Sequence, residues 1–309
     1  MANANYIFLL SLTIILIGFL SKKAGIFSED NARVIAKFIL NITLPALILN
    51  VFSNISINPS LVLLPFLALG YSLLVLSFTY IVSRNYPNRT RGLILMLSVG
   101  FNIGLFAYPM IKGIWGIEGF EYVVMFDLGN SFVVFVFCYT MGFVHSPKIK
   151  PVAEKLEAKN ILKNIFKSAP LLTLIIALGI NLSGIKFPSF ITDILELLSN
   201  ANSPLTLLIL GIFININFEK SNWKLILSVL LIRYAFGISV GLLLMFLLPF
   251  GTFINSAIFV ALILPIGMTT IPFSVEFGYN EQVTSTTVNL TNIISFFIMW
   301  LIVLIFGIG

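Results

Sequence analysis

The stretch GFNIGLFAYPMIKG, from Gly100 to Gly113, lies inside an apolar run long enough to cross a membrane. It contains Asn102, three glycines and Pro109 where a plain lipid-spanning helix would carry leucines. Proline removes a backbone donor from a helix and clashes with the preceding turn. Carbonyl groups freed in this way are costly in hydrocarbon unless protein or a water-filled cavity satisfies them. The stretch therefore predicts a helix that is broken near Pro109 and surrounded by other helices or by a cavity.

The bulk composition places the chain in a membrane. Of its 309 residues, 59% are hydrophobic and 10% are charged, and the mean hydropathy is +1.06. A soluble domain averages about 25% charged residues, so this chain could not cover a water-facing surface. Cys138 and His145 are the single cysteine and the single histidine, which argues against a zinc site and a Cys–His catalytic pair. We expect an all-α polytopic membrane protein with no catalytic residue, no metal and no cofactor.

Apolar runs of about 17–25 residues can cross the hydrocarbon of a bilayer. Ten such runs follow one another along the chain and predict ten transmembrane helices. They cover approximately residues 6–21, 32–53, 61–82, 91–112, 120–144, 168–184, 190–214, 223–248, 254–275 and 282–307.

The basic residues lie mainly on one side of this arrangement. When the loops are assigned alternately to two sides, fifteen of the eighteen Lys and Arg fall on one side, and only Lys112 and Lys186 on the other. Arg233 lies within a span, and we expect it near the basic side, within reach of the interface. Because positive charge stays cytoplasmic, both termini are predicted to face outward from the cell membrane. This asymmetry explains the pI of about 9.4 without nucleic-acid binding.

The longest polar segment, HSPKIKPVAEKLEAKNILKN (His145–Asn164), separates the fifth and sixth spans. This segment has two interpretations: a regulatory or lipid-contacting linker, or a hinge between two halves of the chain. The shortness of the segment and its mixed charges favour the hinge. The expected units are residues 1–144, a cytoplasmic linker at 145–167, and residues 168–309.

The two units resemble each other. GIFSEDNARVIAKFILNITLPALIL (Gly25–Leu49) aligns without a gap on GIKFPSFITDILELLSNANSPLTLL (Gly184–Leu208), with Gly, Ile, Asn and Pro coinciding at an offset of 159 (184 − 25). Further along, Pro109 pairs with Pro272 at an offset of 163 (272 − 109). A nearly constant offset at separate places indicates an internal repeat.

A third match supports the repeat: FDLGNSFVVF at 126–135 pairs with VNLTNIISFF at 288–297, at an offset of 162 (288 − 126). Each unit has five spans, and because five is odd the second unit enters the membrane from the opposite side. Inverted repeats of this kind are a recurrent plan of secondary transporters.

The fourth and ninth spans correspond in this repeat, and both are interrupted. The ninth contains LPIGMTTIPFS (Leu264–Ser274), with two prolines, a glycine and the pair Thr269 and Thr270. Interrupted helices in corresponding positions are the best sequence pointer to a transporter's binding site. The N-terminus of each half-helix carries partial positive charge and free N–H groups, which suit a carboxylate.

Polar residues in the second and fifth spans extend the candidate site. LNITLPALI contains Asn41 and Pro45, and the asparagine could satisfy freed backbone groups or line a cavity. In the fifth span, Asp127 of MFDLGNSF is an acid inside the bilayer and marks a pathway or a proton relay. Structural roles for Asp127, at a broken helix end or paired with Lys112, are the alternatives. The candidate ion-coupling residues are Asp127, Asn130, Asn289 and Asn292.

Two segments resemble the auxin efflux carrier family, in particular its prokaryotic members of the malonate-transporter type. They are GFLSKKAGIFSEDNARVIAKFILNITLPALIL (Gly18–Leu49) and GFNIGLFAYPMIKGIWGIEGFEYVVMFDLGN (Gly100–Asn130). The resemblance implies two inverted five-helix repeats, crossing broken helices at spans 4 and 9, a moving bundle, and a scaffold bundle that dimerises. It implies a small organic anion as substrate. The substrate-binding candidates that follow are Asn41, Pro45, Asn102, Tyr108, Pro109, Thr269, Thr270 and Pro272.

We therefore expect a secondary active transporter that moves a small organic anion by alternating access of the elevator type. Coupling to H⁺ through Asp127 is the first expectation, and Na⁺ coupling, as in bile-acid symporters, is the second. A channel, a membrane sensor without transport and an intramembrane enzyme are the remaining alternatives. The expected partners are the lipid bilayer and a second copy of the chain.

Overall fold

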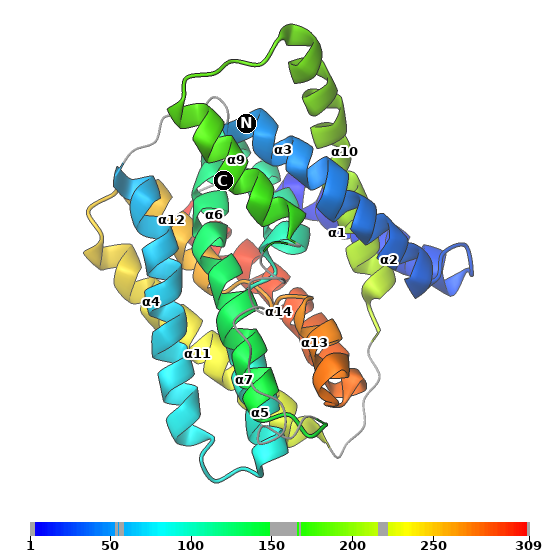
Figure 1. Ribbon diagram of the computed structural model, residues 1–309, viewed down its shortest axis with the longest axis vertical. Helices are drawn as coiled ribbons and strands as arrows, with labels where there is room; N and C mark the ends of the chain where they lie inside the picture. Colours follow the sequence, from blue (N-terminus) through cyan, green and yellow to red (C-terminus); the bar gives the residue numbers. More distant parts are fainter. Residues whose placement is uncertain are drawn as a thin grey trace.

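The computed structural model describes residues 4–52, 55, 59–148, 166, 168–215 and 222–307, and the regular secondary structure of these residues is helical (Figure 1). The first unit contains α1 (Ala4–Lys23), α2 (Glu29–Phe38), η1 (Ile39–Thr43), α3 (Leu44–Phe52), α4 (Pro59–Val82), α5 (Asn88–Ser98), η2 (Ile103–Ala107), α6 (Tyr108–Phe132), η3 (Val133–Cys138) and α7 (Tyr139–Val144). The second contains α9 (Ala169–Leu182), α10 (Ser189–Phe213), α11 (Trp223–Leu247), α12 (Thr252–Leu262), α13 (Thr270–Phe277) and α14 (Glu281–Phe306). The segments η1, η2 and η3 are π-helical.

The all-α polytopic class is confirmed. Seven helical stretches in the described part of the chain are long and apolar enough to cross a membrane, and α9 and α12 are shorter apolar helices. The longest stretch, Ile103–Val144, has left-handed backbone at Gly116 (φ 65°), where the chain turns between the predicted fourth and fifth spans. Each predicted run falls on one or more of these helices, but the count of ten spans stays a prediction.

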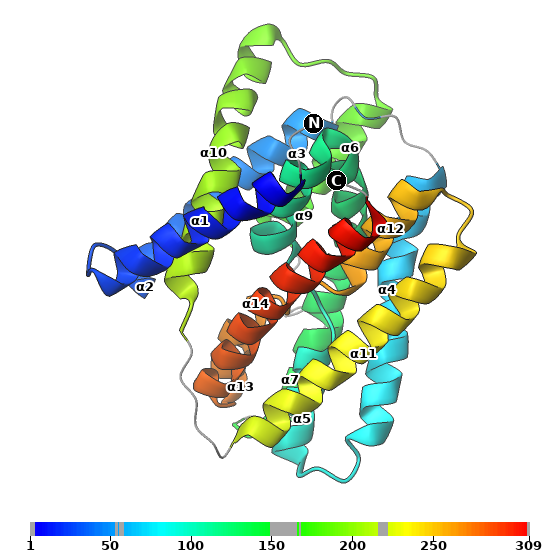
Figure 2. The ribbon, with the colours of Figure 1, turned by 180° about the vertical axis from the view of Figure 1, so that it is seen from behind.

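The helices form two groups that lie on opposite sides of the molecule (Figures 1 and 2). In the first group α1 packs on α10, and α3 packs on both α9 and α10. In the second group α4 packs on α6, and α11 packs on α12. We call them the α10 group (α1–α3, α9, α10) and the crossing group (α4–α7, α11–α14). In both views α4 and α11 lie along one edge, and α1, α2 and α10 lie along the other.

Glycines allow close contacts between helix backbones in both groups. A Cβ added at Gly211 of α10 would lie 1.9 Å from the Ile15 carbonyl oxygen of α1. A Cβ added at Gly237 of α11 would lie 2.5 Å from the Leu262 carbonyl oxygen of α12. Lipid tails are as apolar as leucine, so close backbone approach is a main source of helix association in a membrane.

The prediction that the fourth span breaks near Pro109 is wrong in position. The interruption is at 99–102, where Gly100 has φ 77°, and Pro109 is the second residue of α6, directly after the π-helical η2. Pro45 is likewise the second residue of α3 and follows η1. Local π geometry can re-satisfy the groups that a proline frees, so both helices continue through their proline. In the ninth span the interruption lies between Leu262 and Thr270, ahead of Pro272.

Residues at equal repeat offsets contact each other. Asn102 donates its backbone N–H to the Pro265 carbonyl oxygen at 2.8 Å, and these positions differ by 163, the offset of the two matched prolines. Asn202 Nδ2 donates to Thr43 Oγ1 at 3.1 Å, and these positions differ by 159. Such contacts are expected along the pseudo-two-fold axis of two inverted copies, although the division into two repeats stays a prediction.

Described loops of the predicted basic side contact one another in pairs. Lys22 Nζ donates to the Ile214 carbonyl, which joins the ends of α1 and α10, at 3.2 Å. Ser146 Oγ donates to the Phe277 carbonyl at 2.7 Å, so the start of the predicted linker packs on the end of α13. The remainder of that linker, 149–165 and 167, lies outside the described residues.

Candidate functional site

The candidate site forms where the two interrupted segments cross. The hydrogen bond between Asn102 and Pro265 joins the segments directly. On the second segment, the Ile266 N–H donates to Thr291 Oγ1 of α14 at 3.1 Å. Each segment therefore has backbone groups satisfied by other segments of the protein, which makes non-helical backbone tolerable at this depth.

Asn130 of α6 holds the first segment in place. Its Oδ1 accepts from the Phe101 N–H at 2.8 Å, and its Nδ2 donates to the Phe101 carbonyl at 3.2 Å. The same Nδ2 donates to Asp127 Oδ1 at 2.9 Å, and the other oxygen of Asp127 accepts from Tyr108 Oη at 2.7 Å. The acid therefore has two neutral donors and does not pair with Lys112 in these contacts. A single side chain links the broken backbone to the carboxyl group.

A cavity of about 900 Å³ leads to this crossing. Both half-helix starts line it, with Ile103 and Gly104 from η2 and Met268 and Thr269 just before α13. Helix N-termini attract negative groups through partial positive charge and free N–H donors. The cavity extends to the charged start of α2, which follows a predicted basic loop.

Six of the predicted site residues line the cavity: Asn102, Asp127, Asn130, Thr269, Pro272 and Asn289. Tyr108, Thr270 and Asn292 do not line the cavity themselves, but each is hydrogen-bonded to a residue that does. Tyr108 donates to Asp127, Thr270 Oγ1 donates to the Gly267 carbonyl at 2.8 Å, and Asn292 Oδ1 accepts from Asn102 Nδ2 at 3.4 Å.

The remaining three predicted residues, Asn41, Pro45 and Pro109, also do not line the cavity. Asn41 is exposed, and its Nδ2 donates to the Lys37 carbonyl at 2.7 Å, one turn earlier. This bond goes to a carbonyl one turn before Asn41 and not to a group that Pro45 frees, so the role of Asn41 in satisfying freed backbone groups stays a prediction. Pro45 is half-buried in α3, and Pro109 is buried in α6. The crossing is formed by Asn102 and Pro265 and not by the pair Pro109 and Pro272 that the resemblance suggested.

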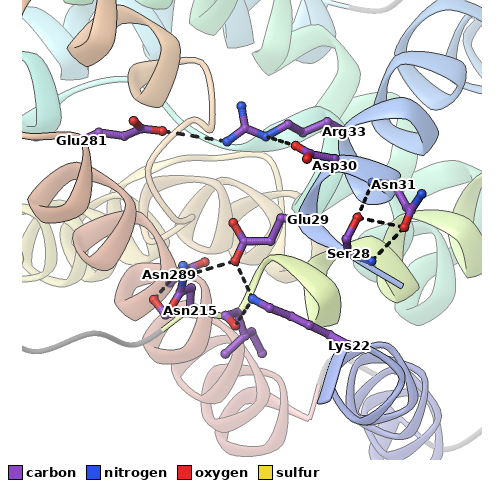
Figure 3. Close-up of polar contacts among 10 residues, drawn as sticks. Lys22, Ser28, Glu29, Asp30, Asn31, Arg33, Asn215, Glu281 and Asn289 are labelled. Atoms are coloured by element: carbon purple, nitrogen blue, oxygen red, sulfur yellow. Dashed lines mark hydrogen bonds and ion pairs between the residues drawn. The ribbon is translucent and has the colours of Figure 1, made fainter. Parts of the chain in front are cut away.

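A polar network, of which the sequence suggested only Asn289, lies at the mouth of the cavity (Figure 3). Its members, the mouth cluster, come from α1, α2, the end of α10 and α14: Lys22, Glu29, Arg33, Asn215, Glu281 and Asn289. Glu29 accepts from Lys22 Nζ at 2.5 Å and from Asn215 Nδ2 at 3.1 Å, and Asn289 Nδ2 donates to the Asn215 carbonyl at 3.2 Å. Arg33 lies 3.8 Å from Glu281. Of these contacts, Arg33–Glu281 and Asn215–Asn289 join the α10 group to the crossing group.

One sequence signal could have found part of this cluster. Glu29 and Arg33 stand four residues apart at the start of a span, and residues at that spacing share a helix face. Ser28 begins the helix through a capping box with Asn31, which fixes the start of α2. The partners from α10 and α14 have no such signal, because they are distant in sequence.

Arg233 is also placed differently from its prediction. Its exposed fraction is 4%, and its guanidinium donates to the carbonyls of Leu97, Ser98 and Leu264 at the crossing. The expectation that it reaches the basic interface is wrong, because carbonyls left free by the interruptions provide acceptors inside the protein.

Comparison with known proteins identifies the family. Residues 8–303 match a family model described as "Membrane transport protein". An uncharacterized transporter of Methanocaldococcus jannaschii is 29% identical over 233 residues, which cover 72% of this chain and 73% of the relative. An uncharacterized transporter of Methanothermobacter thermautotrophicus is 26% identical over 215 residues, which cover 68% and 67%. The chain therefore belongs to the auxin efflux carrier family of membrane transport proteins, and it is a transporter and not an enzyme.

Proposed function

We propose that this protein is a secondary transporter that moves a small organic anion across the cell membrane by alternating access, with binding at the crossing and coupling to H⁺ through Asp127. The observation that carries the proposal is the cavity of about 900 Å³ that ends at two half-helix starts. Its volume is within the range of about 300–1,000 Å³ of small-molecule sites. Two converging helix N-termini favour a carboxylate without requiring a basic side chain.

The proposed coupling follows from the position of Asp127. It is the acid that lines the deep part of the cavity, whereas Glu29 and Glu281 belong to the mouth cluster. An ionised carboxylate repels an anion bound beside it, and a low local dielectric strengthens that repulsion. Protonation of Asp127 removes the repulsion, so proton binding and anion binding favour each other. Bound Na⁺ would neutralise the same charge and is the second candidate for the coupling ion.

The proposed motion uses the two helix groups. The crossing group would move as a unit against the α10 group, which would act as the scaffold and dimerise. The open end of the cavity would face the cytoplasm, since it reaches the start of α2, next to a predicted basic loop, and positive charge stays on that side. In this arrangement the Arg33–Glu281 and Asn215–Asn289 contacts span the two groups and must break during the cycle.

A ligand screen on the purified protein tests the proposal. Thermal unfolding is measured with malonate, malate and indole-3-acetate, at two pH values, with and without Na⁺. We expect one class of anion to raise the unfolding temperature, more strongly at the lower pH. Asp127→Asn should bind at both pH values alike, while Asp193→Asn, a change of an exposed acid on α10, should keep the pH dependence.

The outcomes separate the parts of the proposal. If the anion raises the unfolding temperature only in the presence of Na⁺, and equally at both pH values, the coupling ion is Na⁺ and not H⁺. pH-dependent stabilisation that survives in Asp127→Asn would remove Asp127 from coupling. Counterflow in proteoliposomes then distinguishes a transporter from a channel, since a saturable exchange of labelled anion is expected only of a transporter.

A further inference from the structure

Arg233 is a buried cation in the middle of α11, and it contacts both interrupted segments. Its Nη1 donates to the carbonyls of Leu97 at 3.3 Å and Ser98 at 3.1 Å, and its Nη2 donates to the Leu264 carbonyl at 3.0 Å. The guanidinium also lies over the ring of Phe101, 4.9 Å from its centroid. Of the ion pairs in the described ranges, none includes Arg233.

These acceptors are carbonyls that the fold leaves without helical partners. Leu97 and Ser98 are the last two residues of α5. The last four carbonyls of a helix receive no hydrogen bond from an N–H of the same helix. A helix C-terminus also carries partial negative charge, which a cation offsets. Leu264 lies in the interruption that follows α12. One planar guanidinium presents several donors in a fixed fork, so it can satisfy carbonyls of both segments at once, which a lysine cannot do equally well.

We infer that Arg233 is the positioning residue of the crossing: it fixes the two interrupted segments against each other and thereby sets the floor of the cavity. The connection to the cavity runs through Phe101, which lines it and lies beneath the guanidinium. Asn130 holds the backbone of Phe101 and donates to Asp127, so displacement of this segment would also disturb the carboxyl group. The role requires no particular substrate or coupling ion, and it goes beyond the proposed function.

The chain contains its own reporter for this role. Cys138 is the single cysteine of the sequence and is buried, and its Sγ donates to the Val99 carbonyl at 3.4 Å. Val99 follows Ser98, a direct acceptor of Arg233. A Cβ added at Gly100 would lie 3.0 Å from the same sulfur, so the interruption covers the thiol closely. Movement of this segment away from its position would expose Cys138.

The experiment measures the rate at which a maleimide labels Cys138 in the full chain in detergent, well below the unfolding temperature of each variant. Arg233→Met should label about tenfold faster than wild type, the change produced by a loss of ~1.4 kcal/mol in the free energy of local opening. Arg233→Lys should label at an intermediate rate, because an ammonium retains the charge and some donors but not the fork.

Asn255→Ala is the matched control. Asn255 of α12 donates to the carbonyls of Met245 at 3.0 Å and Leu248 at 2.8 Å, at the other end of the α11–α12 pair. Its loss also removes buried bonds to backbone carbonyls, so we expect a lower unfolding temperature with wild-type labelling of Cys138. Fast labelling in Arg233→Met but not in Asn255→Ala supports the inference.

Two results would overturn it. In one, Arg233→Met is destabilised like Asn255→Ala but labels at the wild-type rate, which would make Arg233 a general packing residue. In the other, Arg233→Met fails to fold, and Arg233→Lys folds and labels at the wild-type rate, so that the fork is unnecessary. Neither measurement uses a transported solute, so failure of the proposed function would leave this test intact.

Discussion

Asn130→Ala is expected to release the first interrupted segment from α6. The side chain is 3% exposed and makes three hydrogen bonds: two with the backbone of Phe101 and one with Asp127. Side-chain hydrogen bonds within membrane proteins average about 0.6 kcal/mol, so three give a lower figure of ~2 kcal/mol. Leaving the buried N–H and C=O of Phe101 without partners costs about 1–3 kcal/mol each, which gives an upper figure of ~6 kcal/mol.

Asn292→Ala is the matched control for this prediction. Asn292 occupies the corresponding position in the second unit, at the offset of 162, and among the described residues its amide accepts one long bond, of 3.4 Å, from Asn102. Both changes replace an asparagine by alanine within a helix, so the intrinsic gain in helix propensity cancels. We expect Asn292→Ala to lower the free energy of unfolding by under ~1 kcal/mol, the ordinary worth of one such bond.

Equilibrium unfolding in mixed micelles of a mild detergent and SDS, followed by far-UV circular dichroism, gives the two free energies. The expected result is a clear separation, with Asn130→Ala unfolding at lower SDS content than Asn292→Ala. Equal shifts for the two variants would refute the reasoning, because they would mean that satisfying the interrupted backbone contributes nothing beyond an ordinary side-chain contact.

Two further predictions concern the helix groups. Gly211→Ala should strongly destabilise the α1–α10 contact, since the new Cβ would lie 1.9 Å from the Ile15 carbonyl oxygen. Gly70→Ala is the control, because its Cβ meets nothing within 4 Å and the change should be neutral or stabilising. Size-exclusion chromatography after heating compares the two variants, and an equal loss of folded protein in both would contradict the proposed close contact at Gly211. A double-mutant cycle on Arg33 and Glu281, 3.8 Å apart with half or more of each side chain exposed, should give a coupling under ~1 kcal/mol. A coupling well above that value in the unfolding assay would show that the mouth contact is desolvated.

The sequence predicted the membrane class and both interrupted helices for a simple reason. The thickness of the hydrocarbon and the cost of a polar group within it act on each stretch of chain locally, so run length and hydropathy reveal the spans. Asp127 and Asn130 were found by the same reasoning, as polar residues where lipid would exclude them. The family resemblance adds the crossing of the fourth and ninth spans.

Only the tertiary structure decided which residues meet there. Proline marks a weak point in a helix, but the chain breaks where freed carbonyls and amides find partners on other helices, so the interruption falls at Gly100 and Asn102 and Pro109 stays helical. Arg233 is buried for the same reason, since its acceptors are carbonyls contributed by α5 and by the segment after α12. Distant partners that do not stand at the repeat offset, such as Arg233 and Leu264, leave no periodicity or spacing in the sequence. The membrane sets the cost of an unpaired backbone group, and the packed helices determine where that group is paired.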